Sequence, residues 1–331
     1  MYLVIGGTSF IGVYVVDELL KKNKEVIVTG RNQNFKDHYR KKSVKFIDLD
    51  ITNVSDFEKI PNDKIDGIIL LAALLPANSK ADLVKNENAA EYIKVNTLGT
   101  LNVLEFARMR KIKRIISTTS YADVFNSWSE KKAITEDEPR NYSLAGDHAA
   151  YVISKNAATD MLIYYNNQHD MKNIIFRLPP VYGVGPHGSL CINGKVKKSG
   201  LQIFIEKAEN GENITIFGNS KLSRDVVYVK DVARAIFLAL ESESANGLYN
   251  MTSGQTISLE DQVKIIISVF GNEMKSKIKY DETIDNNTPS YLFSMKKAEN
   301  DFKFVPEYAD FRKMMVDFKK VRDDKTYEGL F

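Results

Sequence analysis

Short β-branched runs alternate with longer amphipathic segments through residues 1–180. Each short run has the length of a buried strand, and each longer segment spaces its apolar residues with the period of a helix. The predicted strands are Tyr2–Ile5, Val26–Thr29, Val44–Ile47, Ile68–Leu71, Ile115–Thr118 and Ile174–Leu178. The predicted helices are Ile11–Lys22, Glu91–Lys111 and Tyr151–Gln168. This alternation predicts an α/β fold built on a parallel, doubly wound sheet.

The pattern becomes irregular after residue 180, where Gly and Pro cluster around residues 183–200 and the elements shorten. Asp225–Leu240 reads as a strand and a helix that return to the first domain. We therefore predict one domain from residues 1–180 and 225–250. Residues 181–224 and 251–331 are expected to form a smaller C-terminal lobe.

Composition is typical of a globular protein, with 44% hydrophobic and 27% charged residues in 331. The net charge of +3 is spread along the chain, so we expect no nucleic-acid or membrane surface. A single cysteine, Cys191, and no apolar run of membrane-spanning length predict a cytoplasmic protein. The chain enters its first strand directly, so no signal peptide is expected. The histidines have no metal-ligand spacing, and no metal site is predicted.

A glycine-rich turn, Gly6-Gly7-Thr8-Ser9-Phe10-Ile11-Gly12, follows the first strand and opens the first helix. A dinucleotide pyrophosphate needs such a turn, because backbone N–H groups and the helix N-terminus must approach it closely. Gly6 would supply the turn and Gly12 would let the helix pack closely on the sheet, while Ser9 replaces a middle glycine. The alternative is a plain glycine turn, but its position in the α/β pattern favours a dinucleotide site.

The end of the second strand bears on the choice of cofactor. NAD-binding proteins commonly place an acid there to bind the ribose 2′-hydroxyl, whereas an arginine accommodates the 2′-phosphate of NADP. Here the strand ends in Thr29-Gly30-Arg31-Asn32. Arg31 therefore favours NADP over NAD.

Tyr151 and Lys155 are four residues apart on a predicted helix, so they share one face. A nearby ammonium group and a positively charged nicotinamide would both lower the pKa of the phenol and make it a better base. Hydroxyls at the end of the fifth strand, up to Ser120, would lie in the ligand crevice and could hydrogen-bond a substrate oxygen. The alternatives are a tyrosine that packs on its own helix, a solvated lysine, and hydroxyls that cap a turn.

Together these residues resemble the extended short-chain dehydrogenase/reductase family, in particular its NAD(P)-dependent nucleotide-sugar epimerases and dehydratases, which have a Rossmann-type sheet. Further motifs follow in the family's order. They are Asp50-Ile51, Leu71-Ala72-Ala73, Asn96-Thr97-Leu98-Gly99-Thr100-Leu101-Asn102, Arg177-Leu178-Pro179-Pro180-Val181-Tyr182-Gly183, Ile216-Phe217-Gly218, Arg224-Asp225-Val226-Val227-Tyr228-Val229 and Tyr249-Asn250.

The resemblance implies roles for individual residues. Ser120, Tyr151 and Lys155 would be catalytic, with Thr119 as a substitute for Ser120 because the loop after it is one residue longer than usual. The implied dinucleotide-binding residues are Gly6, Thr8, Ser9, Phe10, Ile11, Gly12, Arg31, Asp50, Ile51, Ala72, Ala73, Asn96, Tyr151, Lys155, Leu178, Pro179 and Val181. In the C-terminal lobe, which would bind the substrate, Phe217 would stack on a nucleotide base in a pocket lined by Leu201. Arg224 would bind the diphosphate, and Tyr291 matches a site tyrosine.

The chain also departs from the family pattern. Pro180 replaces an asparagine near the substrate, and residues 283–290 lack a common second arginine for the diphosphate. Tyr121-Ala122 follows Ser120 where sugar dehydratases have Asp-Glu, which argues against dehydration.

The resemblance favours a nucleotide-sugar epimerase, whereas Arg31 and a loose match at His187 favour a reductase of keto sugars. A non-catalytic dinucleotide-binding protein is the alternative from another class. Family members commonly dimerise through two helices per subunit, so a homodimer is expected. Leu101, Leu104, Phe106, Met161, Leu162 and Tyr165 would serve both the core and the partner.

Overall fold

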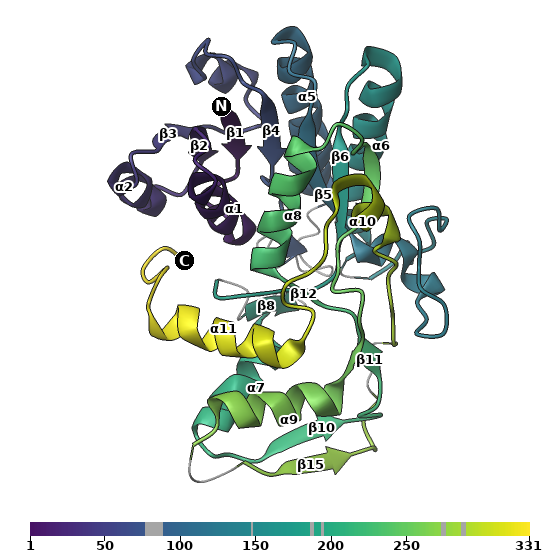
Figure 1. The fold of residues 1–331 in the computed structure, drawn as a ribbon. Helices are drawn as coiled ribbons and strands as arrows, with labels where there is room; N and C mark the ends of the chain where they lie inside the picture. Colours follow the sequence, from purple (N-terminus) through teal and green to yellow (C-terminus); the bar gives the residue numbers. More distant parts are fainter. Residues whose placement is uncertain (77–88, 147, 186–188, 193–194, 273–275, 286–288) are drawn as a thin grey trace.

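A seven-stranded parallel sheet forms the centre of the protein, seen here in a computed structural model that describes residues 1–76, 89–146, 148–185, 189–192, 195–272, 276–285 and 289–331 (Figure 1). The strand order is β13-β6-β5-β4-β1-β2-β3. The strands are β1 (Tyr2–Ile5), β2 (Val26–Gly30), β3 (Lys45–Asp48), β4 (Gly67–Leu70), β5 (Ile115–Ser120), β6 (Ile174–Leu178) and β13 (Gly247–Asn250). The order reverses beside β1, where β4 lies on one side and β2 on the other, and ligands of open α/β sheets bind at such a point.

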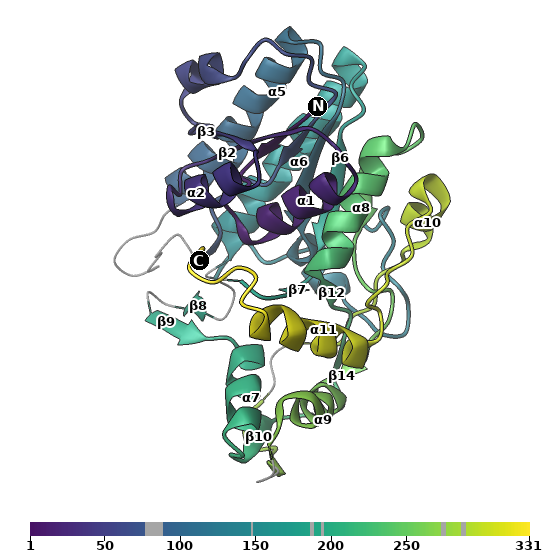
Figure 2. The same ribbon diagram turned by 60° about the vertical axis from the view of Figure 1, so that its left-hand side comes forward.

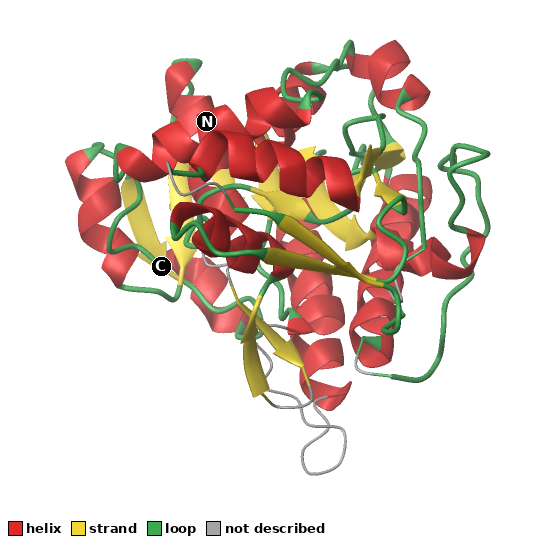
Figure 3. Ribbon diagram, turned by 90° about the horizontal axis from the view of Figure 1, so that it is seen from below, coloured by secondary structure: helices red, strands yellow, loops and turns green. Residues whose placement is uncertain are grey.

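Helices cover both faces of this sheet (Figure 3). The helices are α1 (Phe10–Lys21), α2 (Asn34–Lys41), α4 (Ala89–Tyr92), α5 (Gly99–Met109), α6 (Ala149–His169) and α8 (Val229–Glu241). Alternate strand residues face opposite layers, so that Val4 packs with α1, α2 and α8 while Leu3 packs with α5, α6 and a 3₁₀ helix (Val54–Lys59). The predicted α/β fold with a Rossmann-type doubly wound parallel sheet is confirmed, and all six predicted strands are present with ends shifted by two residues at most.

The C-terminal region below the sheet holds shorter elements (Figure 2). Its helices are α7 (Gly200–Glu209), α9 (Leu259–Phe270) and α11 (Phe311–Asp323), whereas α10 (Lys296–Phe302) packs beside β13 of the sheet. Its two-stranded pairs are β7 (Val181–Tyr182) with β12 (Val227–Tyr228), β8 (Ser189–Ile192) with β9 (Lys195–Lys198), β10 (Ile214–Phe217) with β15 (Ile278–Asp281), and β11 (Ser223–Arg224) with β14 (Ile257–Ser258). One hydrophobic cluster runs from the sheet into this region. The division into two domains at residues 180, 225 and 250 stays a prediction.

The predicted helix Glu91–Lys111 is interrupted by a π-helical segment, Ile93–Leu98, between α4 and α5. A π segment inserts an extra residue into the helix and is common at functional sites. Here it turns the buried side chain of Asn96 toward two neighbouring elements.

Most of the side chains expected to serve a dimer contact belong to the core instead. Leu104, Phe106, Leu162 and Tyr165 are buried between α5, α6 and the sheet. The exposed apolar side chains near these helices are different ones, Leu98, Ile153 and Tyr164. A homodimer stays a prediction, and the interface would not be built from the four buried residues.

A buried ion pair joins β6 to the turn that follows β5. The Nε atom of Arg177 donates to Oδ2 of Asp123 at 3.1 Å and lies 3.0 Å from Oδ1, and the side chains are 1% and 3% exposed. Nη1 of Arg177 donates to Oδ1 of Asn250 at 3.0 Å. Burial raises the pKa of Asp123 and outweighs the opposite effect of Arg177. Such a pair contributes specificity, and the loss of one partner leaves an uncompensated buried charge.

Replacing Asp123 by asparagine is therefore expected to lower the free energy of unfolding by about 3 kcal/mol, because Arg177 stays charged in its buried site. Urea denaturation measures this change. The control is Asp323→Asn, which removes an exposed pair with Lys319 and is expected to leave stability almost unchanged. Equal stabilities of Asp123→Asn and the unmodified protein would contradict the prediction.

Candidate functional site

The glycine turn after β1 lies against the ends of two neighbouring strands. The N–H groups of Gly6 and Gly7 both donate to the carbonyl of Thr29 at 3.0 Å, which fastens the turn to β2. Gly6 has a φ of +87°, and a Cβ atom there would lie 2.4 Å from the amide nitrogen of Ala72 beyond β4. Only glycine fits this turn, as the sequence predicts.

Ser9 and Gly12 shape the first turn of α1. Ser9 is the N-cap residue, and its Oγ accepts a hydrogen bond from the Gly12 N–H at 3.1 Å. A Cβ atom on Gly12 would lie 2.4 Å from the carbonyl oxygen of Gly6. The expectation that Gly12 lets α1 approach the sheet is corrected in this respect, because its close contact is with the glycine turn itself.

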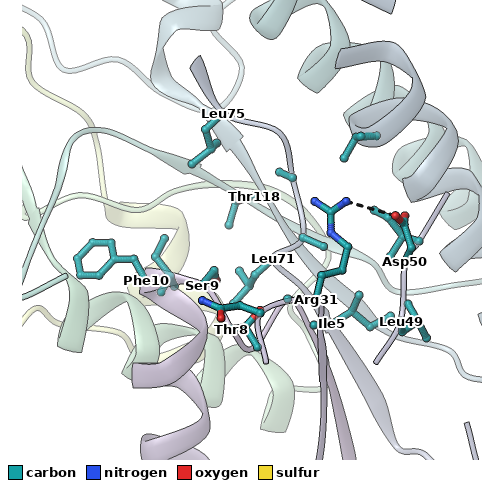
Figure 4. A pocket seen from close by; sticks show the side chains of 18 of the residues that line it. Ile5, Thr8, Ser9, Phe10, Arg31, Leu49, Asp50, Leu71, Leu75 and Thr118 are labelled. Carbon is teal, nitrogen blue, oxygen red and sulfur yellow. Dashed lines mark hydrogen bonds and ion pairs between the residues drawn. The ribbon is translucent and has the colours of Figure 1, made fainter. Parts of the chain in front are cut away.

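A cavity of about 560 Å³ opens above this turn at the carboxyl ends of the strands (Figure 4). Ten of the residues predicted to bind a dinucleotide line it: Gly6, Thr8, Ser9, Phe10, Ile11, Arg31, Asp50, Ile51, Ala72 and Ala73. Seven others do not: Gly12, Asn96, Tyr151, Lys155, Leu178, Pro179 and Val181.

Other lining residues were not predicted from the sequence. These are Ile5, Gly30, Asn32, Leu49, Leu71, Leu75, Val95 and Phe331, whereas Thr118 lines the cavity as expected of a hydroxyl at the end of the fifth strand. Most of them adjoin a predicted residue along the chain, so their place could have been inferred from the strand ends. Phe331 adjoins no predicted residue, so nothing in the sequence indicated that it would line the cavity.

Arg31 and Asp50 form an ion pair on one side of the cavity, as Figure 4 shows. Nη1 of Arg31 lies 3.3 Å from Oδ2 of Asp50. Oδ1 of Asp50 accepts hydrogen bonds from the backbone and the hydroxyl of Thr52. Partial burial raises the pKa of Asp50, but the bonds from Thr52 and the pair with Arg31 outweigh burial and leave the pKa below its usual value. The guanidinium that was expected to hold a 2′-phosphate thus already has a carboxylate beside it.

Asn96 connects the cavity wall to α6. Its amide oxygen accepts from the Leu74 N–H at 2.7 Å, and its Nδ2 donates to the Leu74 carbonyl and to Oγ of Ser154. Ser154 in turn donates to the carbonyl of Tyr151. The buried Asn96 therefore positions the loop after β4 relative to the helix that carries Tyr151, and it is not among the cavity-lining residues.

Tyr151 and Lys155 lie one turn apart near the N-terminus of α6. Lys155 is 6% exposed, and the ring of Tyr151 packs edge-on against the buried Tyr92 at 6.0 Å. Burial lowers the pKa of Lys155 to about 8. Burial, followed by the neighbouring Tyr92 and Tyr121, raises the pKa of Tyr151. The predicted lowering of the Tyr151 pKa does not arise from the protein's own groups, because desolvation of the phenolate dominates.

Ser120 ends β5 and caps the following 3₁₀ helix, Tyr121–Ser127. Its Oγ accepts from the Ala122 N–H at 3.2 Å, so this hydroxyl caps a turn, and its role toward a substrate stays a prediction. A hydroxyl in this position keeps its proton for donation to another oxygen.

Tyr121, which the sequence gives no role, lies close enough to Tyr151 to affect its pKa. Its ring stacks on Trp128 at 4.6 Å and meets Tyr291 at 5.3 Å. Its position directly after the hydroxyl-rich strand end is the signal that could have identified it.

The predicted substrate residues fall into two groups. An isolated β-bridge joins Arg224 to Tyr291. Arg224 lowers the pKa of three tyrosines, Tyr121, Tyr182 and Tyr291, but burial raises each of these pKa values by more. Phe217 ends β10 with 46% of its surface exposed, so ordinary core packing does not explain it. Leu201 is half-buried on α7. Arg224 and Tyr291 therefore lie together with Tyr121. Leu201 lies on α7 and Phe217 on β10, so these two residues come from different elements.

Comparison with known proteins adds to this geometry. Residues 2–252 match the model of the NAD dependent epimerase/dehydratase family. The chain belongs to this family.

A putative UDP-glucose 4-epimerase of Methanocaldococcus jannaschii is 28% identical over 307 residues, covering 91% of this chain and 92% of the relative. The structure of a UDP-glucose 4-epimerase of Thermotoga maritima with UDP-glucose has a TM-score of 0.79 and 22% identity, covering 98% of this chain and 99% of that one. The UDP-glucose 4-epimerase of Thermus thermophilus in complex with NAD has a TM-score of 0.74 and 23% identity, covering 96% of this chain and 98% of that one.

The predicted resemblance is therefore confirmed, and the family is one of NAD-dependent enzymes that act on sugar nucleotides. The comparisons give no support to the preference for NADP that Arg31 indicated. Among the described residues, no helix is both long and apolar enough to cross a membrane. His187 lies outside the described residues.

The burial of Lys155 predicts a pH-dependent stability. Its folded pKa of about 8 lies below the ordinary lysine value of 10.5, so the charged form is disfavoured in the folded protein. Stability is therefore reduced below pH 8 and recovers as the pH rises toward the unfolded pKa. Between pH 7 and pH 10, the unmodified protein is expected to gain about 3 kcal/mol relative to Lys155→Met.

Chemical denaturation of both proteins across this pH range measures the difference. Lys319→Met, at an exposed position, serves as the control and is expected to show no such trend. A pH-independent difference between the unmodified protein and Lys155→Met would contradict the burial of a charged amine.

Proposed function

We propose that this protein is an NAD-dependent nucleotide-sugar epimerase that uses Tyr151, Lys155 and Ser120. The observation that carries the proposal is the joint arrangement of a glycine-turn cavity and a helix with a buried lysine one turn after a tyrosine. Full-length similarity to UDP-glucose 4-epimerases supports the same activity. Ser120, Tyr151 and Lys155 match the family's catalytic positions by their order in the sequence.

The cavity fits a dinucleotide by shape and by chemistry. The glycine turn leaves backbone and the N-terminus of α1 facing the cavity, which suits a pyrophosphate. At the side where Arg31 and Asp50 pair, a carboxylate can accept hydrogen bonds from ribose hydroxyls, whereas a 2′-phosphate would be repelled by it. We therefore favour NAD over NADP for this chain.

Each protein group has a defined task in the proposed reaction. Bound NAD supplies the acceptor and donor of hydride for the sugar carbon. Tyr151 removes the proton of the reacting hydroxyl and later returns it. Ser120 donates a hydrogen bond that aligns the same substrate oxygen. Lys155, buried one turn further along α6, has a pKa near 8 and is mostly protonated at neutral pH, so that together with the positive nicotinamide ring it would favour the phenolate that burial alone disfavours.

The charged and aromatic residues of the C-terminal region suit a nucleotide sugar. Arg224 presents a guanidinium among tyrosine side chains, which suits a diphosphate, and the exposed ring of Phe217 suits a nucleotide base. The lack of Asp-Glu after Ser120 argues against a dehydratase. An epimerase returns its cofactor to the starting redox state in every cycle, so no net oxidation or reduction is expected.

The proposal predicts that purified protein with NAD converts a nucleotide sugar to its epimer with no net change in reduced nicotinamide. A panel of UDP- and dTDP-sugars, followed by product identification and absorbance, measures this. Tyr151→Phe is expected to lower turnover by about 100-fold or more, because the proton acceptor is lost. Its NAD affinity is expected to stay unchanged, because Tyr151 does not line the cavity.

Tyr164→Phe is the matched control, since Tyr164 lies on the same helix and is 49% exposed. It is expected to keep full activity. Net consumption of NADPH with a keto sugar would identify a reductase instead. Cofactor binding without turnover of any sugar would support a non-catalytic protein.

The Arg31–Asp50 pair at the cavity edge predicts that the protein binds NAD in preference to NADP. The unmodified protein is expected to bind NAD at least tenfold more tightly than NADP, and Asp50→Asn is expected to narrow this ratio by freeing Arg31 for a phosphate. Titration calorimetry with both cofactors measures the ratio. Asp48→Asn, an exposed position at the end of β3, is the control. Tighter binding of NADP by the unmodified protein would overturn the assignment.

A further inference from the structure

One wall of the dinucleotide cavity comes from a distant part of the chain. Phe331 lines the cavity, while every other lining residue lies between Ile5 and Thr118. The segment that carries Phe331 follows α11 and runs back beneath α1 and α2, where Figures 1 and 2 both place the end marked C. Neither the family motifs nor the predicted site includes this residue.

The segment is held in place by its own buried residues. Tyr327 and Leu330 are 8% and 6% exposed. The ring of Tyr327 lies 4.7 Å from that of Tyr14 on α1, and its hydroxyl donates to Oδ2 of Asp17 at 3.0 Å. These contacts fix the backbone just before Phe331 against α1, the helix whose N-terminus faces the cavity.

A series of aromatic rings connects Phe331 to the glycine turn. The ring of Phe331 meets Phe35 on α2 edge-on at 5.6 Å, and Phe35 stacks on Tyr39 at 6.0 Å. The hydroxyl of Tyr39 donates to the carbonyl of Gly7 in the turn. Both Phe35 and Tyr39 are fully buried, so this connection is rigid.

The contact of Phe331 with α2 also indicates which half of the cavity Phe331 borders. The helix that Phe331 contacts, α2, begins at Asn34, directly after the cavity-lining Arg31 and Asn32. The end of the second strand is where Rossmann-type proteins hold the adenosine ribose. Phe331 therefore borders the adenosine half of the cavity.

Phe331 is 45% exposed at the cavity wall, whereas Leu330 before it is buried. An aromatic surface held open at a cavity wall gains free energy when an apolar or aromatic face covers it. Adenosine offers such a face, through both the purine and the ribose carbons.

We propose that Phe331 is a binding residue for the dinucleotide, with its ring packed against the adenosine half of NAD. The inference rests on the NAD site and not on the sugar reaction. A protein that binds NAD without epimerising any sugar would leave it intact.

The test measures binding without any sugar present. Titration calorimetry with NAD and with ADP-ribose, which lacks only the nicotinamide of NAD, is carried out on the full chain and on Phe331→Ala. Both ligands are expected to bind Phe331→Ala about fivefold to tenfold more weakly, because an aromatic contact is lost. Phe331→Tyr keeps the ring and is expected to bind both within twofold of the unmodified protein.

Tyr280→Ala is the matched control, since Tyr280 is 52% exposed on β15 and does not line the cavity. Unchanged NAD affinity in Phe331→Ala would overturn the proposal. An equal loss in Tyr280→Ala or in Phe331→Tyr would also overturn it, because the effect would then not report the aromatic contact.

Discussion

The close approach of the glycine turn to the strand ends is the constraint on which the candidate site depends. Gly6 lies so near the backbone of Ala72 that a single added carbon would collide with it. Because β1 lies between β2 and β4, this contact fixes the turn at the point where the strand order reverses. The N-terminus of α1, the ends of β1 to β5 and the Arg31–Asp50 pair then face one cavity.

Burial governs the chemistry of the second part of the site. The protein buries Lys155 and partly buries Tyr151, and desolvation lowers the pKa of Lys155 and raises that of Tyr151, so that both neutral forms are favoured. Tyr151 would become a better base when a positive charge nearby lowers its pKa, and a bound nicotinamide would provide that charge in the proposed reaction. Asn96 links this helix to the cavity wall through Leu74 and Ser154, so the two parts of the site keep one geometry.

Aromatic residues border the proposed site in two places. Tyr121, Trp128 and Tyr291 pack together beside Arg224, where the proposed sugar nucleotide would lie. Phe331 reaches the opposite end of the site from the end of the described chain. Tyr121 comes from the short 3₁₀ helix after β5, and Phe331 comes from the segment after α11.

The parallel sheet could be predicted from the sequence, because hydrophobic periodicity and β-branched runs are local properties that strands and helices must satisfy. The glycine turn and most cavity residues could be predicted as well, since motifs at strand ends converge on one edge of a parallel sheet. The tertiary structure alone decided the partner of Arg31, the π-helical turn at Asn96, the burial of Lys155 and the place of Phe331. These features arise from contacts between residues far apart in the chain, and no local pattern encodes which distant side chain will neutralise a charge or close a cavity.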